Sequence, residues 1–176
     1  SYRPSSKYKE SNFREVLQNP AAFNAFAVYL GTELSLENLE FYEAAKEWKE
    51  AFTTNGSSPE IQEKAIAIIK KYVVSWAPRE VNLSYKAKQK VLEALTDSTR
   101  IESGMFDIAA LEAKQLMYTD SFPRFKRSSL YKAYMNSFAP EDEEDLAIEL
   151  PVWRTCDYNF ICCRGESISD DEETVS

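Results

Sequence analysis

Apolar side chains recur at intervals of three and four residues along most of this chain, and this spacing strongly constrains its fold. Phe41, Ala45, Trp48 and Phe52 illustrate the pattern, because positions spaced in this way lie on one face of an α-helix. Stripes of this kind run from residue 13 to residue 138, where no segment shows the alternation of a β-strand. The sequence therefore predicts an all-α fold with about nine helices.

Proline and capping residues predict where these helices begin and end. Ser35 and Ser84 are suitable N-caps, and a helix is expected to end before Pro78. The expected helices cover a short segment before Pro20, residues 21–30, 35–52, 60–77, 84–95 and 106–117, and one or two short segments after Pro123. A loop at 53–59 and a polar connection at 96–104 separate the longer ones.

Charge divides the chain into a body and a tail. Residues 1–140 hold 17 acidic and 19 basic side chains, whereas residues 141–176 hold 12 acidic and two basic ones. We therefore expect a polar lead-in at 1–11, one helical domain at 12–139, and an acidic tail at 140–176 with an apolar, aromatic stretch at 148–163. The absence of a basic stripe with stacking aromatics argues against nucleic-acid binding.

Side chains for bond chemistry are scarce. The chain has no histidine, which excludes a Ser-His-Asp or Cys-His site, and its four glycines are isolated rather than grouped as a phosphate-binding loop. A row of carboxylates, Glu33, Glu37, Glu40 and Glu43, is interpreted as a solvated face. We expect no cofactor, no metal site and no catalysis by the chain itself.

All three cysteines lie in the tail, so the fold does not depend on disulfides. An odd number of cysteines and the absence of a signal peptide predict a reducing, cytoplasmic environment. No apolar run approaches the ~20 residues of a membrane span. Cys162 and Cys163 are candidate acylation sites that would recruit the chain to the inner face of the plasma membrane, and Ser167 and Ser169 are candidate phosphorylation sites.

Three short segments far apart in the chain carry the most specific signal. They read SLENLEFY at 35–42, EVNL at 80–83 and LMYTDSFPRF at 116–125. Their order and character resemble the regulator of G-protein signalling (RGS) domain family, over roughly residues 12–138 of this sequence. The resemblance implies a central antiparallel four-helix bundle with a small lobe formed by the terminal helices.

The resemblance also implies a function. The best-known members of the family accelerate GTP hydrolysis by α subunits of heterotrimeric G proteins, which they bind in the GTP-bound or transition-state form. Other members are adaptors that bind a protein partner without accelerating hydrolysis. Adaptors usually lack the switch-contacting asparagine or the Asp-Ser pair, whereas Asn82, Asp120 and Ser121 are present here. The activator is therefore the favoured interpretation and the adaptor its alternative.

By resemblance, each segment contributes residues that contact the switch regions of an α subunit. Asn82 corresponds to the switch-contacting asparagine, Asp120 to the aspartate that accepts hydrogen bonds from a switch threonine, and Arg124 to the arginine that supports this aspartate. The other expected contacts are Leu34, Glu37, Asn38, Leu116 and Ser121.

Simpler structural roles remain open for several of these residues. Asn82 is a common type of turn residue, and Asp120 with Ser121 could cap a helix that opens at Pro123. Leu34 stands where many active members have a larger side chain, and the 96–104 connection is longer than in compact members. Both departures bear on affinity and on the choice of α subunit.

The acidic tail allows two interpretations. Its aromatic stretch could pack on the helical body while the acidic flanks modulate the partner-facing surface, or the segment could be a linker between domains.

Overall fold

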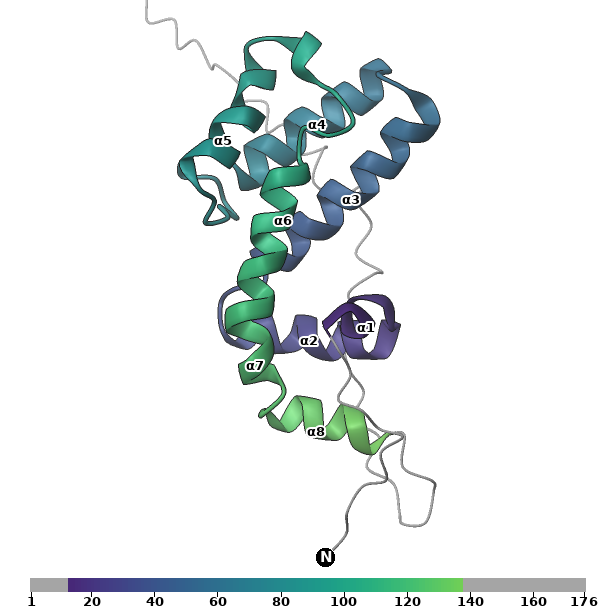
Figure 1. The fold of residues 1–176 in the computed structure, drawn as a ribbon, viewed down its shortest axis with the longest axis vertical. Helices are drawn as coiled ribbons and strands as arrows, with labels where there is room; N and C mark the ends of the chain where they lie inside the picture. The colour runs from purple at the N-terminus through teal and green to yellow at the C-terminus, as the bar shows by residue number, and fades with distance from the viewer. Residues whose placement is uncertain (1–12, 138–176) are drawn as a thin grey trace, which may run out of the picture.

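The computed structural model describes residues 13–137, whose regular elements are all helical (Figure 1). The predicted all-α fold is confirmed. The predictions for the lead-in, for the acidic tail and for its cysteines and serines lie outside the described residues.

The α-helices are α1 (Phe13–Gln18), α2 (Pro20–Thr32), α3 (Glu37–Asn55), α4 (Pro59–Tyr72), α5 (Tyr85–Leu92), α6 (Asp107–Leu116), α7 (Phe122–Phe125) and α8 (Ser129–Asn136). Short 3-10 turns follow α5 at Glu93–Leu95 and Ser98–Arg100.

The buried side chains form two separate cores. The larger lies among α3, α4, α5 and α6 and contains Phe41, Trp48 and Ile69, whereas the smaller lies among α1, α2, α7 and α8 and contains Phe26 and Phe125. Figure 1 shows the two lobes one above the other. This arrangement matches the expected central bundle with a small lobe of terminal helices.

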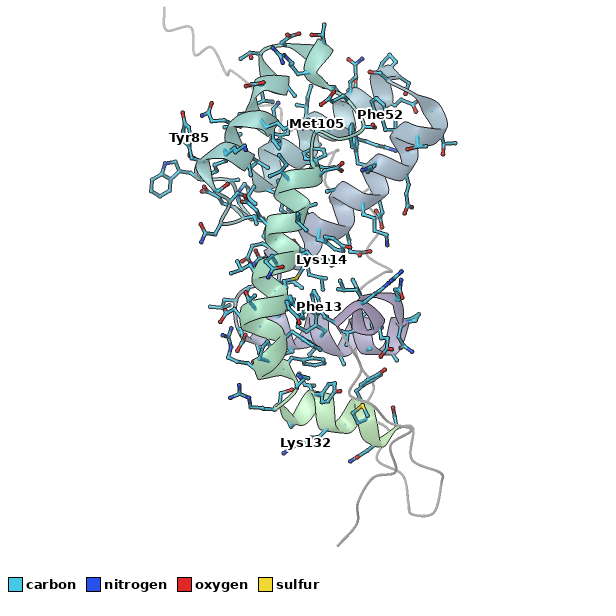
Figure 2. All side chains as sticks on the ribbon, viewed as in Figure 1. Phe13, Phe52, Tyr85, Met105, Lys114 and Lys132 are labelled. Carbon is cyan, nitrogen blue, oxygen red and sulfur yellow. The ribbon has the colours of Figure 1, made fainter. Side chains whose placement is uncertain are left out.

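Two helical elements belong to both lobes. In α3, Leu39 packs in the smaller core and Phe41 in the larger. On the other side, α6 continues through a π-helical turn at Met117–Ser121 directly into α7, forming one rod along the molecule (Figure 1). Figure 2 shows Lys114 on this rod, between Phe13 in the smaller lobe and Met105 in the larger.

Most helix starts agree with the sequence. Asn19 accepts hydrogen bonds from the amides of Ala21 and Ala22 at 3.0 and 3.1 Å, with Pro20 in the first turn of α2, and Ser84 caps α5 through the Ala87 amide.

The start of α3 differs from the prediction. Its N-cap position is Leu36 rather than Ser35, and no side chain caps the helix. The Ser35 amide instead donates to the Leu30 carbonyl at 3.0 Å, which folds the turn back onto α2 and directs the hydroxyl to the same carbonyl.

The 96–104 connection is attached more firmly than its polar composition suggests. Asp97 accepts a hydrogen bond from the Thr99 amide, and Ile101 is buried in the larger core. Of the helices at residues 13–137, none combines the length and the apolar character that crossing a bilayer requires.

Candidate functional site

Charged side chains join the three segments singled out in the sequence. Arg124 in α7 donates two hydrogen bonds to Glu33 in the α2–α3 turn, from Nε and Nη2, both at 2.9 Å. This bidentate geometry is the strongest form of an arginine–carboxylate contact. It attaches the α2–α3 turn to the end of the rod, although the two residues are 91 positions apart.

The α4–α5 loop is attached to the same surroundings at two points. Arg79 donates to both carboxylate oxygens of Glu40 in the first turn of α3, each at 3.1 Å. Glu112 of α6 accepts hydrogen bonds from the Ser84 amide at 2.8 Å and from the Ser84 hydroxyl at 2.6 Å. The loop is thereby tied both to α3 and to the rod.

These contacts correct the interpretation of the carboxylate row. Glu33 and Glu40 are not part of a solvated face, because each forms a bidentate pair with an arginine from another segment. No local sequence pattern predicts these pairs, because the arginines lie 91 and 39 positions away from their carboxylates. Glu112 and Arg79 were likewise missed.

Asn82 lies at the exposed part of the tethered loop. Its neighbour Val81 is fully buried, and the Val81 amide donates to the Tyr72 carbonyl at 2.9 Å. The Asn82 side chain itself is exposed and makes no hydrogen bond within residues 13–137. A side-chain amide carries two donors and one acceptor oxygen, so this group is available to a partner on a backbone fixed at both ends.

Asp120 lies in the π-helical turn, where the wider winding places it on the exposed side of the rod. Arg124 contacts both of its carboxylate oxygens, through Nη1 to Oδ1 and through Nη2 to Oδ2, the latter at 3.0 Å. The expected support of Asp120 by Arg124 is therefore present, and Arg124 also joins Asp120 to Glu33.

Ser121 is buried, and the capping role considered for Asp120 and Ser121 is wrong. The chain continues from the π-helical turn into α7 with helical backbone angles at Ser121, and no side chain caps α7. A helix that continues without interruption has no free amides there for a cap to satisfy. Leu116, the last residue of α6, is half-buried one turn before Asp120.

The residues predicted in the α2–α3 turn fall into two groups. Leu34 is 90% exposed and has a positive φ of 54°, so it projects from the turn. Asn38, in contrast, is 5% exposed, and its amide nitrogen donates to the Ser35 carbonyl at 3.2 Å and to Glu37 at 3.0 Å. Asn38 thus orients Glu37 and the turn from beneath, and its carboxamide oxygen has no hydrogen-bond partner within the described residues.

The ion pairs also set the protonation of the site. Arg124 holds the pKa of both Glu33 and Asp120 below the ordinary carboxyl range, chiefly through its hydrogen bonds to them. Burial, and then the hydrogen bond to Glu33, raise the pKa of Tyr29. Glu33 and Asp120 are therefore charged at neutral pH, and Tyr29 remains a hydrogen-bond donor.

These lowered pKa values predict how the stability of the site depends on pH. A carboxylate whose pKa is lower in the folded state contributes stability above its unfolded pKa, and this contribution is lost as the pH falls through the folded pKa. We expect the wild type to be more stable than Arg124→Ala at about pH 6 and to lose this advantage below about pH 4. Denaturant titrations across this range measure the difference, and a constant difference would contradict the assignment.

The architecture defines a class of protein: a helical binding module that presents polar groups on loops tethered to a rigid scaffold. A model of the "Regulator of G protein signaling domain" matches residues 12–134. The chain belongs to this family.

Proteins named as regulators of G-protein signaling resemble the chain in sequence. The chain is 33% identical over 133 residues to Regulator of G-protein signaling 20 of Bos taurus, a match that covers 76% of the chain and 34% of that relative. It is 31% identical over 161 residues to the human Regulator of G-protein signaling 18, covering 84% of the chain and 65% of that relative. For the human Regulator of G-protein signaling 21 the identity is 33%, with 72% and 78% covered. The chain thus spans about a third of the length of the first of these relatives.

Proposed function

We propose that this chain is a GTPase-activating protein for α subunits of heterotrimeric G proteins. It binds the switch segments of the GTP-bound or transition-state form, stabilises them and so ends the signal. An α subunit supplies its own water-positioning glutamine and its own arginine in cis, so an activator needs no catalytic group. Positioning and electrostatic preorganisation then account for the acceleration.

The amide of Asn82, which is exposed and has no hydrogen-bond partner among residues 13–137, is the observation that carries this proposal. Its loop is held by the Val81 amide, by Arg79 and by Ser84, so little conformational freedom is lost when a partner binds. A group that offers donors and an acceptor without net charge can bridge a glutamine side chain and a threonine in the partner.

Asp120 supports the same proposal from the rod. Its carboxylate is exposed and ionised, and Arg124 fixes its orientation. A fixed carboxylate can accept hydrogen bonds from the backbone amide and the hydroxyl of a switch threonine. Leu34, Glu37, Leu116 and Arg124 complete the proposed contact set, and the buried Asn38 and Ser121 support it from below the surface.

With this function, the chain acts in the cytoplasm, at the inner face of the plasma membrane where the α subunits are anchored. Cys162, Cys163, Ser167 and Ser169 remain proposed modification sites in the part of the chain that the structure does not describe.

The proposal predicts that Asn82→Ala weakens the acceleration by roughly 5- to 100-fold, because one or two hydrogen bonds of about 1–1.5 kcal/mol each are lost. Single-turnover GTP hydrolysis by a panel of α subunits measures the effect. Asn136→Ala, which changes an exposed asparagine in the last turn of α8, is the matched control and should leave the rate unchanged.

The other outcomes separate the remaining interpretations. Binding of an α subunit without acceleration would support the adaptor function. If neither occurs with residues 1–176, the assay is repeated with residues 1–140. Activity that returns in the shorter chain would show that the acidic tail covers the site, and continued inactivity would refute the proposal.

A further inference from the structure

Trp76 is the most exposed large hydrophobic side chain at residues 13–137, with 95% of its surface accessible. It lies in the α4–α5 loop, six positions before Asn82. Leu34, at 90%, comes second. The same two residues are the only non-glycine residues in the described range with a positive φ, 66° for Trp76 and 54° for Leu34.

Both features oppose folding. A bulky L-residue with a positive φ brings its Cβ close to the backbone carbonyl oxygen, which costs free energy that a glycine would avoid. An exposed indole also forgoes the gain that burial would bring. Strained and exposed positions of this kind persist where the surrounding structure fixes them, and they concentrate at functional sites.

The loop around Trp76 is fixed by specific contacts. The Trp76 amide donates to Glu80 at 2.8 Å, and Lys88 of α5 binds the other oxygen of that carboxylate. These two contacts, from Lys88 first and then from the Trp76 amide, lower the pKa of Glu80. Further along, the Ala77 amide donates to the Val74 carbonyl and the Arg79 amide to that of Lys71, both at 3.1 Å. The backbone at Trp76 is therefore held by hydrogen bonds, and the indole projects from it into solvent.

We propose that Trp76 is an apolar anchor that inserts into an apolar depression on the G-protein α subunit bound by Asn82 and Asp120. This inference deepens the proposed function and rests on it. The partner follows from continuity, because Trp76 and Asn82 lie on one tethered loop and a protein covering Asn82 approaches the indole as well. Tryptophan is enriched among the few residues that dominate protein–protein affinity, and a backbone that is already fixed loses little entropy on binding.

The anchor adds selectivity to the polar contacts. Hydrogen bonds to switch residues serve every α subunit that presents those residues, whereas an indole requires a matching apolar depression. An α subunit with a charged side chain at that place would leave the charge desolvated against the ring, and its binding would be disfavoured. Trp76 therefore determines which α subunits bind tightly.

Trp76→Gly tests the proposal, since glycine adopts a positive φ without strain. We expect the dissociation constant for the preferred α subunit, trapped with a transition-state mimic of the γ-phosphate, to rise at least about tenfold. The denaturation midpoint should stay the same or increase. Leu111→Ala is the matched control, because Leu111 is 64% exposed on α6 but outside the tethered loops, and its affinity should remain that of the wild type.

A second measurement leaves the sequence unchanged. In protein labelled with 5-fluorotryptophan, the ¹⁹F resonance of Trp76 should lose its H₂O/D₂O solvent shift when the α subunit binds, while that of the buried Trp48 should not change. A Trp76 resonance that keeps its solvent shift in the complex would overturn the inference.

The two proposals fail in different ways. If Trp76→Gly binds like the wild type while Asn82→Ala is weakened, the anchor is refuted and the activator function stands. If the wild type binds none of the α subunits, the proposed function is refuted and the anchor with it.

Discussion

Replacing Trp48 with alanine is expected to lower the free energy of unfolding by about 3–5 kcal/mol. Trp48 is 3% exposed and packs edge-on against Phe106, with ring centroids 5.1 Å apart and planes at 90°. Its indole nitrogen also donates to the Ile61 carbonyl of α4 at 2.8 Å. The alanine variant leaves a cavity in the larger core and removes the hydrogen bond between the indole and the Ile61 carbonyl. Denaturant unfolding followed by circular dichroism measures the loss.

Trp48→Phe separates these two contributions. It keeps part of the aromatic packing but removes the N–H group, so we expect a smaller loss, of about 1–3 kcal/mol, from the missing hydrogen bond and the smaller ring. Equal losses for the two variants would show that the hydrogen bond rather than the packing dominates.

Replacing Arg124 with alanine is expected to weaken the activity strongly, because this side chain contacts two parts of the candidate site. The change releases the α2–α3 turn from the rod and leaves Glu33 and Asp120 without their common cation. We expect the acceleration of GTP hydrolysis to fall at least about tenfold, because Asp120 and the α2–α3 turn lose the side chain that orients them. The stability should change little, because ion pairs between exposed side chains contribute weakly to stability.

Two further variants test this explanation. Arg124→Lys keeps the positive charge but cannot form the planar bidentate contact, so it should recover only a small part of the activity. Arg127→Ala removes an exposed arginine three positions later and should behave like the wild type. Full activity in Arg124→Lys would show that charge alone, rather than geometry, is required.

The fold was predictable from sequence because its determinants are local. Apolar spacing along Phe41, Ala45 and Trp48 defines the buried face of α3, and Ser84 marks the start of α5 correctly. Where the local sequence was compatible with more than one helix start, contacts with another helix determined which residue begins the helix. Ser35, for example, does not cap α3 as predicted, because its amide donates a hydrogen bond to the Leu30 carbonyl and the turn folds onto α2.

The candidate site was predictable only in outline. Motif resemblance indicated Asn82, Asp120 and Arg124, but it could not show that Glu33, Glu40 and Glu112 hold the three segments in place. Pairs of charges this far apart in sequence leave no periodic pattern. The π-helical turn was also missed, since an extra residue in one helical turn does not alter the apolar spacing enough to be recognised.

The rod of α6, the π-helical turn and α7 passes through both hydrophobic cores, as does α3. Neither lobe can therefore melt without pulling two helices out of the other, so the domain behaves as a single cooperative unit despite its two cores. Loops attached to such a unit are held in place by it, and substitutions of their exposed side chains have little effect on the stability of the domain. Natural variation in partner choice can then accumulate at residues such as Leu34 and Trp76 while the scaffold beneath them remains the same.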